Sequence, residues 1–151
     1  MSGLTDEQQR AWRSLMLATI VLDGALDRQS QRDGGMPHAY YKALVVLYET
    51  PGRRLAMGAL AAQLRYSLSR LTHAVASMEK SGWLRRSRST DDRRVQFVQL
   101  TDAGIQTVRH VSPLQATEVR ARAFSRLTAE QVQQLDAITA AIIEGLDSPA
   151  S

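Results

Sequence analysis

The sequence of 151 residues contains no cysteine, and only 5% of its residues are aromatic. The absence of cysteine excludes a disulfide scaffold, thiolate ligation of zinc and a thiol redox switch. No apolar run approaches the roughly 20 residues that a membrane-spanning helix needs. The first residues, Met1 to Glu7, lack the basic start and apolar stretch of a signal peptide, so we expect a cytoplasmic protein.

Positive charge is abundant but unevenly placed. The formal net charge of the whole chain is +4. The segment from Arg53 to Arg94 holds ten Lys or Arg and three acidic residues, which gives +7, whereas the remainder holds nine bases and twelve acids, which gives −3. Such segregation is typical of a polyanion-binding face, although a solvated basic surface would give the same count.

Helix signals cover most of the chain. The box Thr5-x-x-Gln8, followed by apolar residues at helical spacing, predicts a helix from Thr5 to about Arg32. A second Thr-x-x-Gln box at Thr128 opens a last helix with one apolar face. Further helices are expected at 37–50, 57–64, 68–81 and from 102 onward, with a kink or interruption at Pro113. We expect the tail, 147–151, to fray.

Two short runs after Gly82 have the composition of β-strands. They cover 83–87 and 95–100, and the polar turn 88–94 joins them as a hairpin. The order of elements is then helix, helix, helix-turn-helix, hairpin, helix, helix. This order predicts a mainly α fold with a small β-hairpin wing, which is a winged helix-turn-helix between N- and C-terminal helices.

The predicted helix 68–81 has two different faces. Its apolar face, with Leu71, Val75 and Met78, should pack inward. The other face combines hydroxyls, a guanidinium and an imidazole, which can reach base edges or phosphates in a major groove of DNA. We expect Arg70 and His73 to supply base discrimination, with a phosphate contact as the alternative role of His73. The full set of expected contacts in and before this helix is Ser67, Ser69, Arg70, Thr72, His73 and Ser77.

The hairpin tip is the second candidate site. Arginines on a projecting two-stranded ribbon can enter a minor groove, so we add Arg86, Arg93 and Arg94. Arg94 is expected where the second strand begins, and Asp92 is expected to order the tip by pairing with an arginine. An exposed polar turn of this composition is also common without any such role.

Phosphate contacts are expected from several of Arg53, Arg54, Arg65, Arg85, Arg86 and Arg88.

Several of these segments together resemble the MarR family of regulators. The resemblance rests on Leu60–Leu64, on the turn and helix start Ser67–Thr72, and on Met78–Gly82. The spacing of Asp92-x-Arg94 from Leu100-Thr101, continued by Asp102-Ala-Gly104, is similar to the wing signature of that family. The chain departs from the family pattern at two positions: Arg65 stands where glycine is frequent in the turn, and His73 where arginine is frequent in the recognition helix.

The resemblance implies a single domain over 1–151 that works as a homodimer. It implies a winged helix-turn-helix lobe at 53–101 and dimerisation helices at 5–32 and 102–147. The terminal helices also carry more apolar positions than one small domain can cover, notably Leu15, Leu22, Leu135, Ile142 and Leu146. The implied function is a sequence-specific transcriptional repressor that binds a pseudo-palindromic operator in double-stranded DNA, with recognition helices in major grooves and Arg94 in a flanking minor groove.

The family resemblance also implies release by a small aromatic or other small-molecule effector. Trp12, His38, Tyr40 and Tyr41 are candidates to line its pocket, although an aromatic core residue, or for His38 a surface residue near a helix start, is the commoner role of each one taken singly. We expect no cofactor, because the sequence has no glycine-rich phosphate loop. No metal site is expected either, since the three histidines lie far apart without ligand spacing.

Two other functional classes compete with a DNA-binding regulator. An enzyme would need a catalytic constellation, and the Ser77-x-x-Lys80 pattern lacks the companion motifs of serine-lysine enzymes. A winged-helix module that binds protein without sequence-specific DNA binding is the alternative function, and the +7 charge of 53–94 argues against it.

Overall fold

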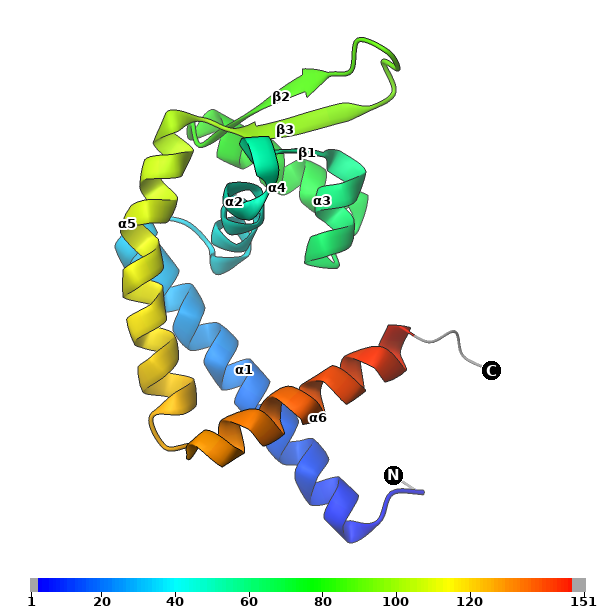
Figure 1. Cartoon of the computed structure of the whole chain (residues 1–151), viewed down its shortest axis with the longest axis vertical. Helices are drawn as coiled ribbons and strands as arrows, with labels where there is room; N and C mark the ends of the chain where they lie inside the picture. The colour runs from blue at the N-terminus through cyan, green and yellow to red at the C-terminus, as the bar shows by residue number, and fades with distance from the viewer. Residues whose placement is uncertain (1–2, 148–151) are drawn as a thin grey trace.

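The computed structural model describes residues 3–147, and most of them are helical (Figure 1). The longest helix, α1, is followed by α2, by the helix-turn-helix pair α3 and α4, by a hairpin, and by α5 and α6. The helices are α1 Asp6–Gly34, α2 His38–Glu49, α3 Met57–Leu64, α4 Leu68–Lys80, α5 Asp102–Val119 and α6 Ala129–Asp147. The expected fraying of 148–151 lies outside the described residues.

Local capping signals set the starts of the helices at the two ends of the chain. Thr5 and Gln8 form a reciprocal capping box at the start of α1, with hydrogen bonds of 3.0 and 3.1 Å. Thr128 and Gln131 do the same before α6, at 2.9 and 3.1 Å. The Thr101 hydroxyl accepts from the backbone N–H of Gly104 and caps α5. These three starts confirm the sequence prediction.

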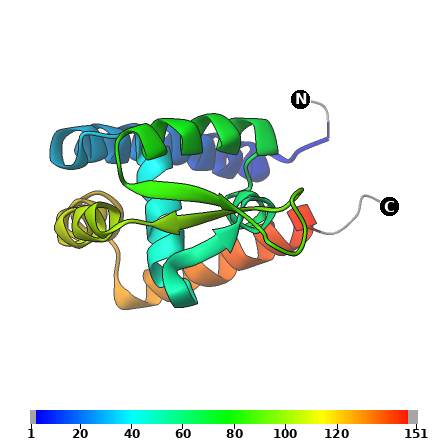
Figure 2. The same ribbon diagram turned by 90° about the horizontal axis from the view of Figure 1, so that it is seen from above.

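The middle of the chain, residues 36–101 together with the start of α5, forms what we call the reading lobe. Its core is a continuous cluster of buried side chains contributed by α2, α3, α4, the strands and α5, including Leu44, Leu60, Leu71 and Val98. Because α4 presents its apolar face to this core, its polar face is turned outward. Figure 2 shows the hairpin extending across the helices of the lobe.

The wing is a three-stranded sheet, one strand more than the sequence predicted. The strands are β1 Arg54–Ala56, β2 Leu84–Arg88 and β3 Gln96–Leu100, in the order β1-β3-β2. All pairs are antiparallel, with Leu84 opposite Leu100 and Leu55 opposite Val98. The hairpin strands begin one residue later than expected. The short β1 anchors the base of the wing to the start of α3.

The helices α1 and α6 and the lower part of α5 extend away from the lobe (Figure 1). We call these three segments the arms. No residue of α6 is buried within this chain. A kink or an interruption was expected at Pro113; the interruption is wrong, because α5 runs continuously from Asp102 to Val119, and the kink stays a prediction. Pro113 is exposed, so the carbonyl that loses its helical N–H partner can be solvated. A π-helical turn, Arg120–Phe124, then ends α5. Within residues 3–147 no helix has the length and hydropathy required to cross a membrane.

Candidate nucleic-acid interface

The outward face of α4 carries every residue that the sequence analysis placed there. The side chains of Ser67, Ser69, Arg70, Thr72, His73 and Ser77 are all exposed. Ser67 also caps the helix, since its hydroxyl accepts from the backbone N–H of Arg70 at 3.1 Å. The Arg70 guanidinium stacks on the ring of Tyr66 at 3.9 Å from the ring centroid. This stacking orients the guanidinium while leaving its N–H groups available to acceptors.

The wing tip is ordered by two short polar side chains. The Ser89 hydroxyl accepts from the backbone N–H groups of Asp91 and Asp92, at 3.2 and 3.3 Å. The Asp92 carboxylate accepts from the backbone N–H of Arg94 at 3.0 Å and from its guanidinium at 3.1 and 3.2 Å. Through these bonds Arg94 holds the pKa of Asp92 below its usual value. Arg94 lies in the turn, two residues before β3, so Asp92 and not the strand holds it in place.

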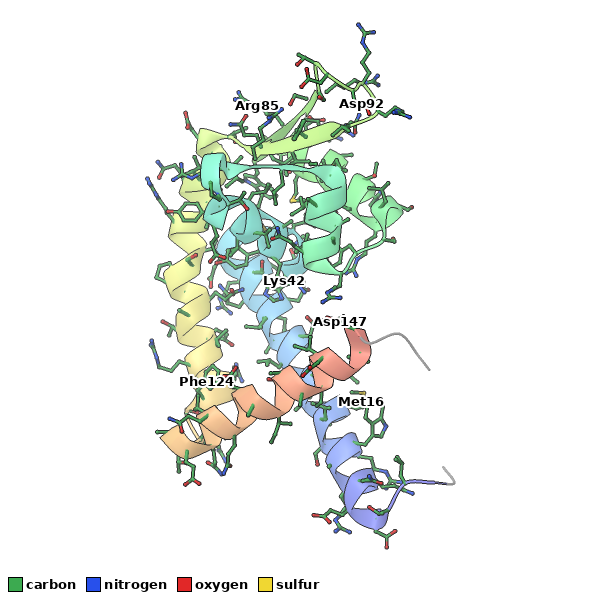
Figure 3. The ribbon with its side chains drawn as sticks, turned by 45° about the vertical axis from the view of Figure 1, so that its right-hand side comes forward. Met16, Lys42, Arg85, Asp92, Phe124 and Asp147 are labelled. Carbon is green, nitrogen blue, oxygen red and sulfur yellow. The ribbon has the colours of Figure 1, made fainter. Side chains whose placement is uncertain are left out.

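An open groove separates the start of α4 from the wing tip. It has a volume of about 490 Å³, and its rim carries three arginines, Arg88, Arg93 and Arg94. Leu68, the first residue of α4, lines the same groove with 58% of its surface exposed. The sequence analysis did not predict that Leu68 lines this groove, because an apolar residue at the start of a helix is typical of a core position. Figure 3 shows the Asp92 loop projecting at the far end of the lobe from the arms.

Arg86, an expected DNA contact, has a different role in the structure. Its guanidinium donates to the Glu79 carboxylate at 2.9 and 3.2 Å, and its backbone N–H donates to the same carboxylate at 2.9 Å. These bonds lower the pKa of Glu79. Both side chains are about one-third exposed, so the pair joins the end of α4 to β2 inside the lobe. Arg86 thus positions β2 against the end of α4, and its expected contact with DNA stays a prediction.

The other expected phosphate contacts are partly engaged as well. Arg53 stacks on Tyr48 at 5.0 Å and Arg54 on Phe97 at 3.7 Å, while Arg85 donates to Gln99 at 3.2 Å. These contacts keep the three cations on the surface of the lobe. Arg65 forms an ion pair with a carboxylate of α6, and its expected phosphate contact stays a prediction.

The four residues suggested for an effector pocket do not all come together in one chain. His38 and Tyr41 lie in α2 with their rings stacked at 6.3 Å, and the Tyr41 hydroxyl hydrogen bonds with Ser112 at 2.9 Å. Tyr40 is half-buried beside them. Trp12 lies 15 residues before Asp27, the α1 residue that accepts from the His38 N–H, or about 22 Å along the helix.

His38, the first residue of α2, is a buried titratable group. It is 8% exposed, and its Nδ1 has no hydrogen-bond partner among the described residues. Nδ1 lies 3.9 Å from a carboxylate oxygen of Asp23. Burial lowers the pKa of His38, assisted by Lys42 and opposed by Asp23 and Asp27. The imidazole is therefore favoured in its neutral form.

The residues of the serine-lysine pattern and the possible metal ligands can be placed in the structure. Ser77 and Lys80 are both exposed on α4. Across residues 3–147, histidine and acidic side chains form no group of three or more that could hold a metal ion. The polar residues that do gather, at α4 and the wing tip, are suited to hydrogen bonding with an anionic duplex.

Comparison with known proteins places this geometry in a family. The model of the MarR family matches residues 37–95. The transcriptional repressor MprA of Escherichia coli strain K12 is 29% identical over 113 residues, or 75% of this chain, and the match spans 64% of the length of that protein.

Two solved structures are similar over nearly the whole chain. Sco3205, a MarR family transcriptional regulator from Streptomyces coelicolor solved in complex with DNA, is 47% identical, with a TM-score of 0.94 over 98% of this chain and 92% of its own. AbsC from the same organism, also a MarR family regulator, is 34% identical, with a TM-score of 0.90 over 97% of this chain and 98% of its own. The chain therefore belongs to the MarR family of winged helix-turn-helix transcriptional regulators.

Proposed function

We propose that this protein is a cytoplasmic, homodimeric repressor that binds a pseudo-palindromic operator in double-stranded DNA. One observation carries the proposal: the exposed polar face of α4 stands beside an arginine-bearing wing tip across an open groove. A helix with that face fits a major groove, and the phosphate backbone would then pass between α4 and the wing. The similarity to Sco3205, solved with DNA, supports the same mode of binding.

We assign base reading to Arg70 and His73, with Ser69, Thr72 and Ser77 beside them on α4. Arg93 and Arg94 at the wing tip are assigned to the flanking minor groove, where negative potential is strongest in A·T-rich sequence. The DNA-binding lobe spans 53–101, and the helices at 5–32 and 102–147 serve dimerisation. A regulator of this family needs no catalytic machinery, so the enzyme alternative is set aside.

Dimerisation is supported by apolar surface on the arms that this chain leaves exposed. A groove of about 900 Å³ runs between α1 and α6, lined by Leu15, Leu22, Val132 and Leu135. Neighbouring side chains, among them Ile20 and Ile142, are also exposed. A second copy related by a twofold axis would bury both the groove-lining residues and these neighbouring side chains. The same axis would place two α4 helices on successive major grooves of a palindrome.

The central experiment is selection of bound sequences from a random pool of duplex DNA. We expect a palindromic consensus for the wild type and a relaxed consensus for Arg70→Ala, with a cost of about 1–3 kcal/mol at the best site. Unselective binding by the wild type would instead favour the protein-interaction module. An unchanged consensus in Arg70→Ala would mean that a different face reads the bases.

The wing is tested separately with Arg94→Ala and Asp92→Ala. Both variants should weaken operator binding, since Asp92 holds the Arg94 guanidinium with two hydrogen bonds. Simple electrostatics predicts the opposite sign for Asp92→Ala, because the change removes a negative charge near DNA. Tighter binding by Asp92→Ala would show that the tip acts as a charged loop without the ordered contact.

We also propose that a small molecule controls the repressor at the junction of α2 and α5. Tyr41, Lys42 and Gln115 line a groove of about 310 Å³ there, and the buried Gln115 Nε2 has no partner among the described residues. The chemistry fits a small aromatic anion. In a titration of DNA-bound protein with aromatic carboxylates and their neutral amides, we expect release by an acid, and reduced release in Gln115→Leu. Release that Gln115→Leu leaves unchanged would place the effector elsewhere.

A further inference from the structure

Arg65 occupies a backbone conformation that does not favour arginine. It follows α3 as its C-terminal cap with φ 56° and ψ 36°, in the left-handed region. Glycine adopts this region without steric cost, whereas a residue with a Cβ does not. The turn between α3 and α4 would therefore form more easily without this side chain. The presence of an arginine requires an explanation in what its guanidinium contacts.

The guanidinium contacts a carboxylate that is also locally unfavourable. Asp147 is the last residue of α6, where the helix dipole disfavours negative charge, and the last turn of α6 contains no basic residue. Arg65 Nη1 donates to Asp147 Oδ1 at 2.7 Å and Nη2 to Oδ2 at 2.9 Å. This two-pronged pair lowers the pKa of Asp147. One contact, between residues 82 positions apart, thus accounts for two locally disfavoured residues.

The pair joins the two functional parts of the molecule. Arg65 immediately precedes Tyr66, whose ring supports the Arg70 guanidinium, and Ser67, which caps α4. Asp147 ends the arm helix α6, which Figure 3 shows returning beneath the lobe. We propose that the Arg65–Asp147 ion pair is a strut that sets the angle of the recognition helix relative to the arm. In the dimer of the proposed function, on which this role rests, that angle fixes the separation of the two α4 helices and hence the preferred half-site spacing.

The effect of the strut should appear in orientation more than in stability. Both side chains are substantially exposed, and exposed ion pairs add little to the stability of a fold. A restraint of this strength corresponds to a preference of at most about fivefold between competing arrangements. We therefore expect its loss to broaden the range of lobe angles, with nearly unchanged thermal unfolding.

The first experiment measures the angle without DNA. The chain has no cysteine, so Ala76→Cys on α4 and Gln134→Cys on α6, both at exposed positions, can carry a pair of spin labels. Labelled chains diluted with unlabelled ones report the distance within one protomer. We expect a single narrow distance distribution for the parent and a broader one for Arg65→Gly and for Asp147→Asn. Glu118→Gln, which removes an exposed ion pair with Arg122, is the matched control and should leave the distribution unchanged.

The second experiment measures half-site spacing. A library presents two copies of the selected half-site separated by a variable number of base pairs. The parent should prefer one spacing, and Arg65→Gly and Asp147→Asn should lose up to about fivefold of that preference. Asp147→Asn, which keeps every expected phosphate contact, should bind a single half-site as tightly as the parent. The reversed pair, Arg65→Asp with Asp147→Arg, should restore both the distance and the spacing.

The outcomes separate the strut from the proposed function. Distance distributions that coincide in the parent, Arg65→Gly and Asp147→Asn would overturn the strut, whether or not the protein binds DNA. Broadened distributions with an unchanged spacing preference would overturn its role in operator selection. A parent protein without sequence preference would contradict the proposed function, while the distance measurement would still decide whether the strut exists.

Discussion

The reading lobe and the arms bury their apolar residues in different ways. In the lobe, α2, α3, α4 and the sheet enclose a common core in which Leu44, Leu47 and Leu71 are fully buried. On the arms, Ile20 of α1 is 70% exposed, and α6 buries no residue at all. The lobe is complete within one chain, whereas the arms carry apolar surface in amounts typical of an interface. The difference indicates that folding of the lobe and assembly of the arms depend on separate sets of residues.

The largest expected effect comes from placing a charge on the arm. Ile142→Asp should weaken the dimer by about 3–6 kcal/mol, because the substitution removes an apolar side chain from the proposed interface in both copies. Sedimentation at micromolar concentration should show monomers. The lobe should stay folded, as reported by the fluorescence of Trp83. Gln134→Asp, a charge at a polar position of the same helix, should leave the dimer intact. A stable Ile142→Asp dimer would contradict the assignment of this face.

The next effect concerns the lobe. Gly104 lies at the start of α5, where an added Cβ would collide with the backbone carbonyl of Trp83 and with Leu100. Gly104→Ala should lower the free energy of unfolding by about 1–3 kcal/mol, because the backbone there cannot yield easily. Gly145→Ala on α6, where the space is open, is the matched control and should be neutral or stabilising. Denaturant unfolding of the two variants measures the difference in their free energies of unfolding. Equal losses of stability in both would contradict the predicted collision at Gly104.

A smaller effect concerns Leu68, an exposed apolar residue in the lobe, whose other large apolar side chains are covered. Among the described residues, Leu68 is the one large apolar side chain of the lobe that is exposed, and it lines the groove beside the wing tip. We expect it to contact a thymine methyl group. Replacing thymine by uracil in the operator should then weaken wild-type binding by about fourfold per contact, corresponding to about 0.8 kcal/mol, and should not affect Leu68→Ala. An equal uracil effect in both proteins would assign Leu68 another role.

The smallest effect concerns His38, which lies where α2 of the lobe contacts α1 of the arms. Burial lowers the pKa of His38 in the folded protein below its ordinary value of 6.5. Below about pH 6.5 the unfolded chain therefore binds a proton that the folded chain resists, and stability should fall as the pH drops from 7 to 5. His38→Gln should flatten the dependence in that window. Asp92 and Asp147, whose pKa values are lowered by arginines, lose their contribution only below about pH 4. A parallel pH dependence in the variant would exclude His38 as its cause.

The sequence predicted those parts of the structure that are determined locally. The bounds of α3, Met57–Leu64, were predicted as found, as were the caps at Thr5, Thr101 and Thr128. Helix periodicity and capping act over a few residues, so a single sequence contains them. The exposed face of α4 followed from the same periodicity. The roles of its residues in DNA reading stay predictions that the experiments above test.

The parts that were missed depend on how the elements pack together, which local patterns do not contain. The strand β1 has three residues, too few to show alternation, and forms because β3 offers it a partner. The ion pairs Arg86–Glu79 and Arg65–Asp147 join elements whose relative placement is set by the core. Continuous α5 at Pro113 reflects exposure on the outer side of the helix, which periodicity did not resolve. In each case tertiary packing decided between locally similar alternatives.

The capping boxes at Thr5 and Thr128 have a consequence for how fast two chains can meet. Both boxes satisfy the first backbone N–H groups of α1 and α6 from within each helix, without a second chain. The arms therefore reach an encounter with helical structure already favoured, and little backbone ordering remains to slow the productive collision. Association should then proceed at the rate of docking preformed surfaces, and the exchange of subunits between dimers should be governed by the rate at which they separate.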